Sequence, residues 1–295
     1  AAQLLIQHFL PIDFDILHHV SYLLIGNTNL TIRKRKAREM FDLLPIEIPD
    51  LSGKTILITG AGRGIGAVLA GRLVSKGAKV YAGVLGSPDV NYSNHLTNCT
   101  IVELDVTDAG QISSVLTRIK SETGKLDALI NNAGAITPIA HIDTLATESL
   151  RQAYEVNALG VHRMTCSALP FLRASKGVVI NAGTGAATTP MEGWAAYCNS
   201  KAAARMLTLM FAKDLEGSGV QFFFIGIPPT DTEMQEEIRM AGLNPISKIQ
   251  KSDLVHPNVP ASVMAWLCGP QARKLDDVLL DVREEPFKSM MSRLD

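Results

Sequence analysis

The chain has 295 residues, of which 46% are hydrophobic and 19% are charged, and this composition excludes a disordered protein. Because 28 basic residues are balanced by 29 acidic ones, the net charge is −1 and nothing global indicates a nucleic-acid-binding protein. The length allows one large α/β domain or two smaller ones.

Residues 1–50 differ in pattern from the rest of the chain. Apolar residues recur there at roughly helical spacing, so we expect an N-terminal helical extension. A basic run at 33–38 (RKRKAR) follows; we favour a solvated helix face over membrane-surface binding or a targeting signal. The stretch 16–32 is too polar to predict a membrane-spanning helix. Pro45 and Pro49 then predict an extended segment before the main domain.

From residue 54 onward the pattern changes to alternating strands and helices. Short apolar stretches predict strands at residues 54–60, 78–85, 99–106, 126–134, 177–184 and 220–227. Helices are predicted between them, at residues 66–77, 111–124, 147–167 and 195–219. Short apolar strands that alternate with helices indicate a parallel sheet covered on both faces. The sequence therefore predicts an α/β fold, with one doubly wound, Rossmann-like domain over residues 51–295.

A glycine-rich turn joins the first predicted strand to the first predicted helix. Gly60, Gly64 and Gly66 have no Cβ, so backbone N–H groups and a helix N-terminus can approach a pyrophosphate. Their spacing departs from the G-x-G-x-x-G fingerprint, so a glycine-rich turn without a ligand stays open as an alternative.

The end of the second predicted strand bears on the choice of cofactor. Residues 84–87 contain no acid that would bind the ribose 2′-hydroxyl of NAD. Arg63, inside the glycine turn, is placed to pair with the 2′-phosphate of NADP. We therefore favour NADP, with NAD as the alternative; a loop arginine that merely faces solvent is the other interpretation of Arg63.

Tyr197 and Lys201 are four residues apart on a predicted helix and so share one face. A tyrosine normally holds its proton until about pH 10. A nearby ammonium would lower that pKa and allow proton exchange near neutrality. Tyr/Lys pairs at this spacing are also common on exposed helix faces without any function. This pair therefore indicates an active site only together with the motifs around it.

Five motifs occur in order along the chain, namely 59–66 (TGAGRGIG), 131–134 (NNAG), Asn157 in YEVNALG, Thr184, and 197–201 (YCNSK). Together they resemble the short-chain dehydrogenase/reductase family, in the branch with a Y-x-x-x-K active site, over about residues 51–285. The resemblance implies hydride transfer between a nicotinamide cofactor and a carbonyl carbon, and we favour ketone reduction. The alternative is a protein of this fold that has lost redox chemistry and serves as a ligand-binding protein, scaffold, lyase or cyclase.

The resemblance also implies roles for individual residues. Tyr197 would be the proton donor in ketone reduction, and Lys201 would lower its pKa and hold the ribose hydroxyls. Thr184, where the family usually has serine, would hydrogen-bond to the substrate oxygen, and Asn157 would support a proton relay through Lys201. The residues expected to contact the cofactor are Gly60, Arg63, Gly64, Ile65, Gly66, Asp105 at the adenine, Asn131 at the ribose, Tyr197, Lys201, Thr230 and Thr232.

Two prolines depart from the family pattern after the sixth predicted strand. Aligned on the Asp231-Thr232 pair, Pro228 occupies the place of the usual glycine and Pro229 follows it. They remove two N–H donors and fix φ in a loop that the resemblance assigns to the carboxamide. The N–H of Thr230 remains, so we expect nicotinamide binding to be strained but retained.

Apolar residues flank the predicted site on both sides. A lid over about residues 232–252 and the segment 186–196 contribute Met191, Trp194, Met234, Ile238, Met240 and Leu243, which form either an apolar pocket or ordinary packing. On the pocket interpretation the substrate is a lipophilic ketone or secondary alcohol.

The remaining expectations concern metals, partners and location. The four cysteines show no paired spacing, so neither a disulfide framework nor a metal site is expected. The resemblance implies a homodimer or homotetramer formed through the helix that carries the Tyr/Lys pair. We expect no nucleic-acid partner and a cytoplasmic protein; membrane association through residues 1–50 is the less favoured alternative.

Overall fold

The computed structural model describes residues 43–87 and 92–291. The chain divides into two units, Ala1–Asp42 and Leu43–Asp295. The predicted helical extension up to residue 42, with its basic run, lies outside the described residues. Residues 43–50 pack on the main domain, since Ile46 and Ile48 are buried and the N–H of Ile46 donates to Ser262 Oγ at 2.9 Å.

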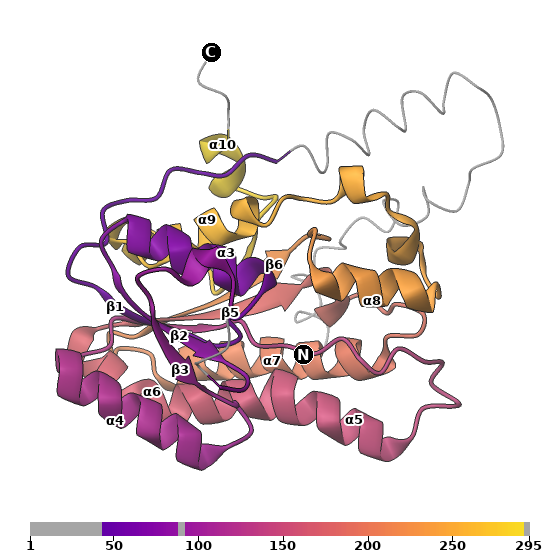
Figure 1. The fold of residues 1–295 in the computed structure, drawn as a ribbon, viewed down its shortest axis with the longest axis horizontal. Coiled ribbons are helices and arrows are strands. Elements are labelled where there is room, and N and C mark those ends of the chain that lie inside the picture. Colours follow the sequence, from indigo (N-terminus) through magenta and orange to yellow (C-terminus); the bar gives the residue numbers. More distant parts are fainter. Residues whose placement is uncertain (1–42, 88–91, 292–295) are drawn as a thin grey trace, which may run out of the picture. The chain divides into compact units, whose positions relative to one another are not determined.

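A seven-stranded sheet in the order β3-β2-β1-β4-β5-β6-β7 forms the centre of the domain (Figure 1). Each neighbouring pair of strands is parallel. Most strand residues are buried, because a parallel sheet is covered on both faces. The predicted doubly wound α/β fold is confirmed. The strands are β1 (Thr55–Ile58), β2 (Lys79–Val84), β3 (Thr100–Glu103), β4 (Ala128–Asn131), β5 (Val178–Thr184), β6 (Gln221–Ile227) and β7 (Leu279–Asp281).

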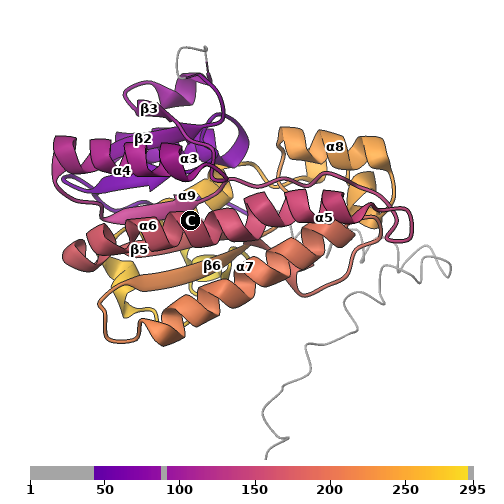
Figure 2. The same ribbon diagram turned by 90° about the horizontal axis from the view of Figure 1, so that it is seen from below.

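Helices cover both faces of the sheet. In Figures 1 and 2, α3 and α9 lie on one face, and α4, α6 and α7 lie on the other. Among the described residues, no helix has both the length and the apolar character needed to cross a membrane. The helices are α3 (Gly64–Ser75), α4 (Ala109–Thr123), α5 (Thr147–Tyr154), α6 (Gly160–Ser175), α7 (Ala195–Asp214), α8 (Glu233–Ala241), α9 (Asn258–Leu267) and α10 (Phe287–Met290).

The helix predicted at residues 147–167 differs from the observed structure in two ways. A π-helical segment, Glu155–Leu159, separates α5 from α6, and α6 continues to Ser175 with Pro170 inside it. A π-helical turn widens the backbone locally and is frequent at functional sites. The segment therefore marks the place where Asn157 leaves the regular helical register.

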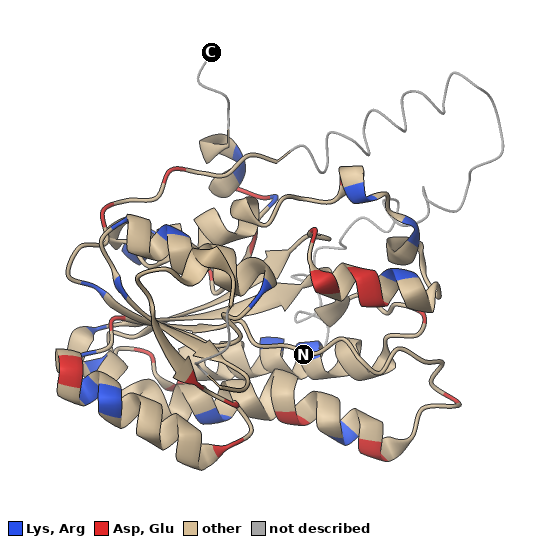
Figure 3. Ribbon diagram, in the orientation of Figure 1, with Lys and Arg blue, Asp and Glu red and all other residues tan. Residues whose placement is uncertain are grey.

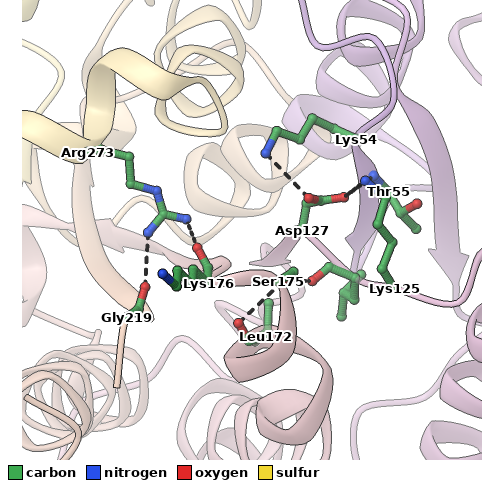
Figure 4. Close-up of polar contacts among 10 residues, drawn as sticks. Lys54, Thr55, Lys125, Asp127, Leu172, Ser175, Lys176, Gly219 and Arg273 are labelled. Atoms are coloured by element: carbon green, nitrogen blue, oxygen red, sulfur yellow. Dashed lines mark hydrogen bonds and ion pairs between the residues drawn. The ribbon is translucent and has the colours of Figure 1, made fainter. Parts of the chain in front are cut away.

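Polar contacts occupy the amino-terminal edge of the sheet (Figure 4). The buried carboxylate of Asp127 accepts the N–H of Thr55 at 2.8 Å and pairs with Lys54 at 3.3 Å and Lys125 at 3.1 Å. The guanidinium of Arg273 donates to two backbone carbonyls, which ties the C-terminal part of the domain to this edge. These charged groups are thus paired with one another or with the backbone. The predicted site residues lie at the opposite edge of the sheet.

Candidate active site

The predicted site residues gather where the parallel strands end. The sheet order changes direction between β1 and β4, and ligands of open α/β sheets bind at such a switch point, outside the carboxyl ends of the strands. The glycine turn follows β1, Asp105 follows β3, Asn131 ends β4, Thr184 ends β5 and Thr230 follows β6. The topology thus places residues that are far apart in the sequence along one edge.

The backbone conformation of the glycine turn suits the binding of an anion. Gly60 and Gly64 have φ angles of +65° and +56°, which side chains disfavour. A Cβ on Gly66 would lie 2.3 Å from the carbonyl oxygen of Gly60, so no side chain fits there. Arg63, the residue before α3, provides no side-chain cap, and the first turn contains no acid. The first N–H groups of α3, including that of Ile65, have no carbonyl partner within their own helix, and such a helix N-terminus suits an anion such as a pyrophosphate.

Two neighbouring asparagines, Asn131 and Asn132, make different contacts. Asn132 Nδ2 donates to the carbonyl oxygens of Thr59 (3.1 Å) and Gly60 (2.9 Å), and so braces the glycine turn. The buried Asn131 instead donates to Asn181 Oδ1 at 2.8 Å. Successive residues of a strand point to opposite faces, so only one of the two can face the turn. The side chain of Asn131 thus lies in the interior, and the contact of Asn131 and its neighbours with the ribose stays a prediction.

Arg63 extends from the glycine turn toward Glu237 of the acidic helix α8, whose Glu residues are coloured red on the ribbon in Figure 3. Its side chain is 69% exposed, and its Nη2 lies 4.0 Å from Glu237 Oε1. This distance is the limit of an ion pair, so the guanidinium is held loosely. A cavity of about 500 Å³ lies beside it, lined in part by Tyr92, whose ring packs against Gly62. Arg63 is thus free to approach a phosphate near this turn.

Asp105 and the threonines after β6 are also placed at this edge. Asp105 Oδ1 accepts the N–H and the hydroxyl of Thr107, both at 2.8 Å, which fixes the turn after β3. Thr230 is buried, and its hydroxyl donates to the carbonyl of Pro228 at 2.8 Å. Thr232 precedes α8 and packs near Gly64 of the glycine turn.

The two prolines lie in a rigid segment after β6. Val255 N–H donates to the carbonyl of Pro229, and Asp231 N–H donates to the carbonyl of Val255, both at 3.0 Å. In such a parallel bridge the residue between the two bonds directs its own N–H to the other side. The N–H of Thr230, the donor that remains after the prolines, therefore points away from Val255.

Tyr197 and Lys201 lie one turn apart on α7, with only 8% and 5% of their surfaces exposed. Lys201 Nζ is 5.9 Å from the centroid of the Tyr197 ring and donates to the carbonyl of Ala182 at 2.9 Å. The ammonium thus lies over the aromatic face and uses one of its three donors on the backbone.

Burial shifts the pKa values of both members of this pair. Burial raises the pKa of Tyr197 to about 12, although a hydrogen bond with Thr184 works in the opposite direction. Burial also lowers the pKa of Lys201 to about 8. For Tyr197 the loss of water around the phenol outweighs the hydrogen bond with Thr184, and the role of Lys201 in lowering this pKa stays a prediction. The phenol is therefore an acid that keeps its proton at neutral pH.

Asn157 lies in the π-helical segment and is completely buried. Its Oδ1 accepts the N–H of Ala135 at 2.9 Å, and its Nδ2 donates to the Ala135 carbonyl at 2.8 Å and to Ser200 Oγ at 3.0 Å. A Cβ on Gly134 would lie 3.3 Å from Asn157 Oδ1 and 3.5 Å from Lys201 Nζ. Asn157 thus positions the segment beside Lys201; Ser200 is a supporting residue that the sequence motifs did not single out.

Apolar side chains surround Tyr197. Trp194, Ile136, Ala186 and Ile238 form one buried cluster with it, and Met191, Met234, Ile139, Cys198 and Ile246 pack against this cluster. Leu243 lies next to Gly193. Met240 is 82% exposed and does not belong to the cluster, because it lies on the solvent face of α8. The predicted apolar surroundings are present, with Ile136 as an addition.

Comparison with known proteins identifies the family. Residues 54–242 match the family model described as short chain dehydrogenase. The chain belongs to this family. This short-chain dehydrogenase is 34% identical over 246 residues to the 2,3-dihydro-2,3-dihydroxybenzoate dehydrogenase of Escherichia coli, covering 79% of this chain and 97% of the relative. It is 30% identical over 236 residues to the benzil reductase ((S)-benzoin forming) of Saccharomyces cerevisiae, covering 73% and 90%.

Solved structures agree with this assignment. The short-chain dehydrogenase fold superposes on the ligand-free aldohexose dehydrogenase of Thermoplasma acidophilum with a TM-score of 0.70 and 26% identity, covering 80% of this chain and 94% of that one. The KRED1-Pglu enzyme gives a TM-score of 0.67 and 29% identity, covering 73% and 94%. The family resemblance inferred from the motifs is confirmed.

Proposed function

We propose that this short-chain dehydrogenase reduces a lipophilic ketone to a secondary alcohol with a nicotinamide dinucleotide. The observation that carries this proposal is the buried Tyr197, next to Thr184 and Lys201, at the same sheet edge as the glycine turn. The bound cofactor would supply the hydride to the carbonyl carbon. The protein would position the substrate and the cofactor and would supply a proton.

The chain's own residues divide this work. The N-terminus of α3 and the glycine turn would hold the pyrophosphate, and Lys201 has donors left for ribose hydroxyls beyond its bond to Ala182. Thr184 would orient the substrate oxygen, and Tyr197 would donate its proton to it. Tyr197 carries its proton at neutral pH, since burial raises its pKa to about 12, and the protonated phenol is the form that donates in ketone reduction. Asn157 would hold the Ala135 segment for a relay through Lys201.

NADP is the cofactor that we propose. Arg63 is exposed at the glycine turn and is held only by a loose contact with Glu237. At the end of β2, Leu85 is exposed and no acid is present in residues 84–87. A 2′-phosphate would therefore meet the guanidinium of Arg63 at the glycine turn, and the end of β2 supplies no carboxylate in residues 84–87 to repel it.

The substrate that we propose has an apolar skeleton. The cluster around Tyr197 supports this, since its aromatic and aliphatic side chains offer mainly dispersion contacts. The names of two relatives, a benzil reductase and a dihydrodihydroxybenzoate dehydrogenase, point to ring-bearing substrates in those proteins.

Turnover with a matched pair of variants tests the proposal. Tyr197→Phe is expected to lower ketone reduction at least about 10³-fold while NADPH still binds, because the proton donor alone is lost. Tyr81→Phe is the control, since Tyr81 is also a buried tyrosine with a pKa raised to about 12, and its hydroxyl donates to Glu122, away from the site. Equal turnover in Tyr197→Phe and wild type would contradict the mechanism.

A second candidate function is supported by the prolines after β6. Pro228 and Pro229 leave the Thr230 N–H as the donor at the place where the carboxamide would bind. A protein of this fold that binds a ligand without redox chemistry would show no turnover with either dinucleotide and any ketone. Replacing Pro228 and Pro229 by glycine and alanine would then increase nicotinamide binding, whereas a functional reductase would change little.

We also propose that the protein forms a homodimer or homotetramer through α7. Met206 and Met210 are one turn apart on this helix, and both are exposed. Light scattering on wild type and on a Met206→Glu, Met210→Glu double variant tests this. The variant is expected to be a monomer; an unchanged assembly would exclude this face.

A further inference from the structure

A cavity of about 430 Å³ lies at the amino-terminal edge of the sheet, opposite the glycine turn. Three cations, Lys54, Lys176 and Arg273, line it together with one carboxylate, that of Asp127 (Figure 4). We call it the Lys176 cavity. Its volume lies within the range of small-molecule sites, which is about 300–1,000 Å³. The other lining residues are Ser175, Gly219, Cys268, Gly269 and Pro270.

The polar groups of the Lys176 cavity leave positively charged donors free. The ammonium of Lys176 has no ion pair or hydrogen bond with any described residue. Arg273 donates to the carbonyls of Gly219 and Lys176 but pairs with no carboxylate in the described part of the chain, and a guanidinium has five N–H donors. The Asp127 carboxylate is already engaged by two lysines and a backbone N–H. A ligand that fits these groups is therefore an anion with several acceptor atoms.

The backbone of Lys176 provides an independent observation. Lys176 ends helix α6 in the left-handed conformation, with φ +50° and ψ +49°. Helices usually place glycine there, as α4 does with Gly124 (φ +73°) and α8 does with Gly242 (φ +68°). The lysine stem lies against Gly219, where a Cβ would be 3.2 Å from Lys176 Cγ. A lysine in this conformation lowers stability, so its presence indicates a use for its side chain.

We propose that the Lys176 cavity binds a phosphate group, either as free phosphate or as part of a small molecule. A phosphate monoester carries a charge of about −1.5 to −2 at pH 7 and three strong acceptor oxygens. These oxygens match the free donors of Lys176 and Arg273. The volume leaves room beyond the phosphate for a small organic part beside Cys268 and Pro270. This site does not depend on the proposed ketone reduction.

Calorimetric titrations with inorganic phosphate and with phenyl phosphate test the site, at about 0.15 M ionic strength. Lys176→Gly is expected to weaken binding at least about tenfold, and Lys176→Arg to keep it within about threefold. Lys274→Ala is the control, because Lys274 is an exposed neighbour of Arg273 that does not line the cavity; its binding should stay within about twofold. Tighter binding of phenyl phosphate supports a phosphorylated small molecule, and equal binding supports free phosphate.

Stability separates a binding role of Lys176 from a structural one. Glycine accepts a positive φ, so Lys176→Gly is expected to keep or raise the urea midpoint while it loses phosphate binding. A lower midpoint with unchanged binding would overturn the proposal. If Lys176→Gly does not fold, Lys176→Met keeps the stem, and the same loss of binding is expected.

Arg63→Ala distinguishes this cavity from the glycine turn, which also suits an anion. Phosphate binding to the Lys176 cavity is expected to be unchanged in Arg63→Ala. Loss of binding in Arg63→Ala but not in Lys176→Gly would place the phosphate at the glycine turn and overturn the proposal. Absence of measurable binding to the wild type would overturn it as well.

Discussion

The charge of Lys201 is expected to control the pH dependence of the reaction. Burial lowers the pKa of this ammonium from 10.5 to about 8, while Tyr197 keeps its proton to about 12. A group with a pKa of about 8 is roughly 90% charged at pH 7 and roughly 10% charged at pH 9. If the charged form is the active one, kcat/KM for NADPH is flat below about pH 7.5 and falls about tenfold per pH unit above 8.

Initial rates between about pH 6 and 10, at saturating ketone, measure this dependence, because kcat/KM for the cofactor reports groups of the free enzyme. Lys201→Arg should remove the decline, even if its rate is lower, since a guanidinium stays charged over this range. Lys213→Arg is the control, because Lys213 is an exposed lysine on the same helix that pairs with Glu216. A decline that begins only near pH 10, or that persists in Lys201→Arg, would refute the assignment.

Two further pairs of variants probe the cofactor edge. Arg63→Ala is expected to weaken NADPH binding about tenfold in calorimetric titrations and to leave NADH within about twofold, because a charge-assisted bond to the 2′-phosphate is lost. Glu237→Gln, which releases Arg63, should tighten NADPH; equal effects on both dinucleotides would contradict the role of Arg63. Asn132→Ala should weaken both dinucleotides, because the glycine turn loses its brace. Asn131→Ala should instead lower the free energy of unfolding by about 2 kcal/mol in urea with affinity retained, and the reverse ranking would contradict the placement of the two side chains.

Much of the fold could be predicted because buried parallel strands are short apolar runs between turns. This signal located the cores of β1 to β6. β7 has three residues and is too short to show a pattern. The π-helical segment Glu155–Leu159 has no sequence signal of its own, because it depends on the contacts of Asn157 with Ala135.

The site could be predicted only as far as motifs fix positions along the chain. The motif 131–134 contains two asparagines, and the strand geometry decides which one faces the glycine turn. Spacing alone places Tyr197 beside Lys201, but burial determines their pKa values, and burial depends on the whole fold.

Isotope transfer tests the central claim most directly. The purified protein is incubated with 1-phenyl-1,2-propanedione and NADPH that carries deuterium at both C4 positions, and the product is analysed by mass spectrometry and NMR. The account predicts an alcohol with deuterium on the carbinol carbon in wild type, and almost none with Tyr197→Phe, which still binds NADPH. Binding of NADPH without transfer of the label to any ketone, or labelled product formed by Tyr197→Phe at the wild-type rate, would contradict it.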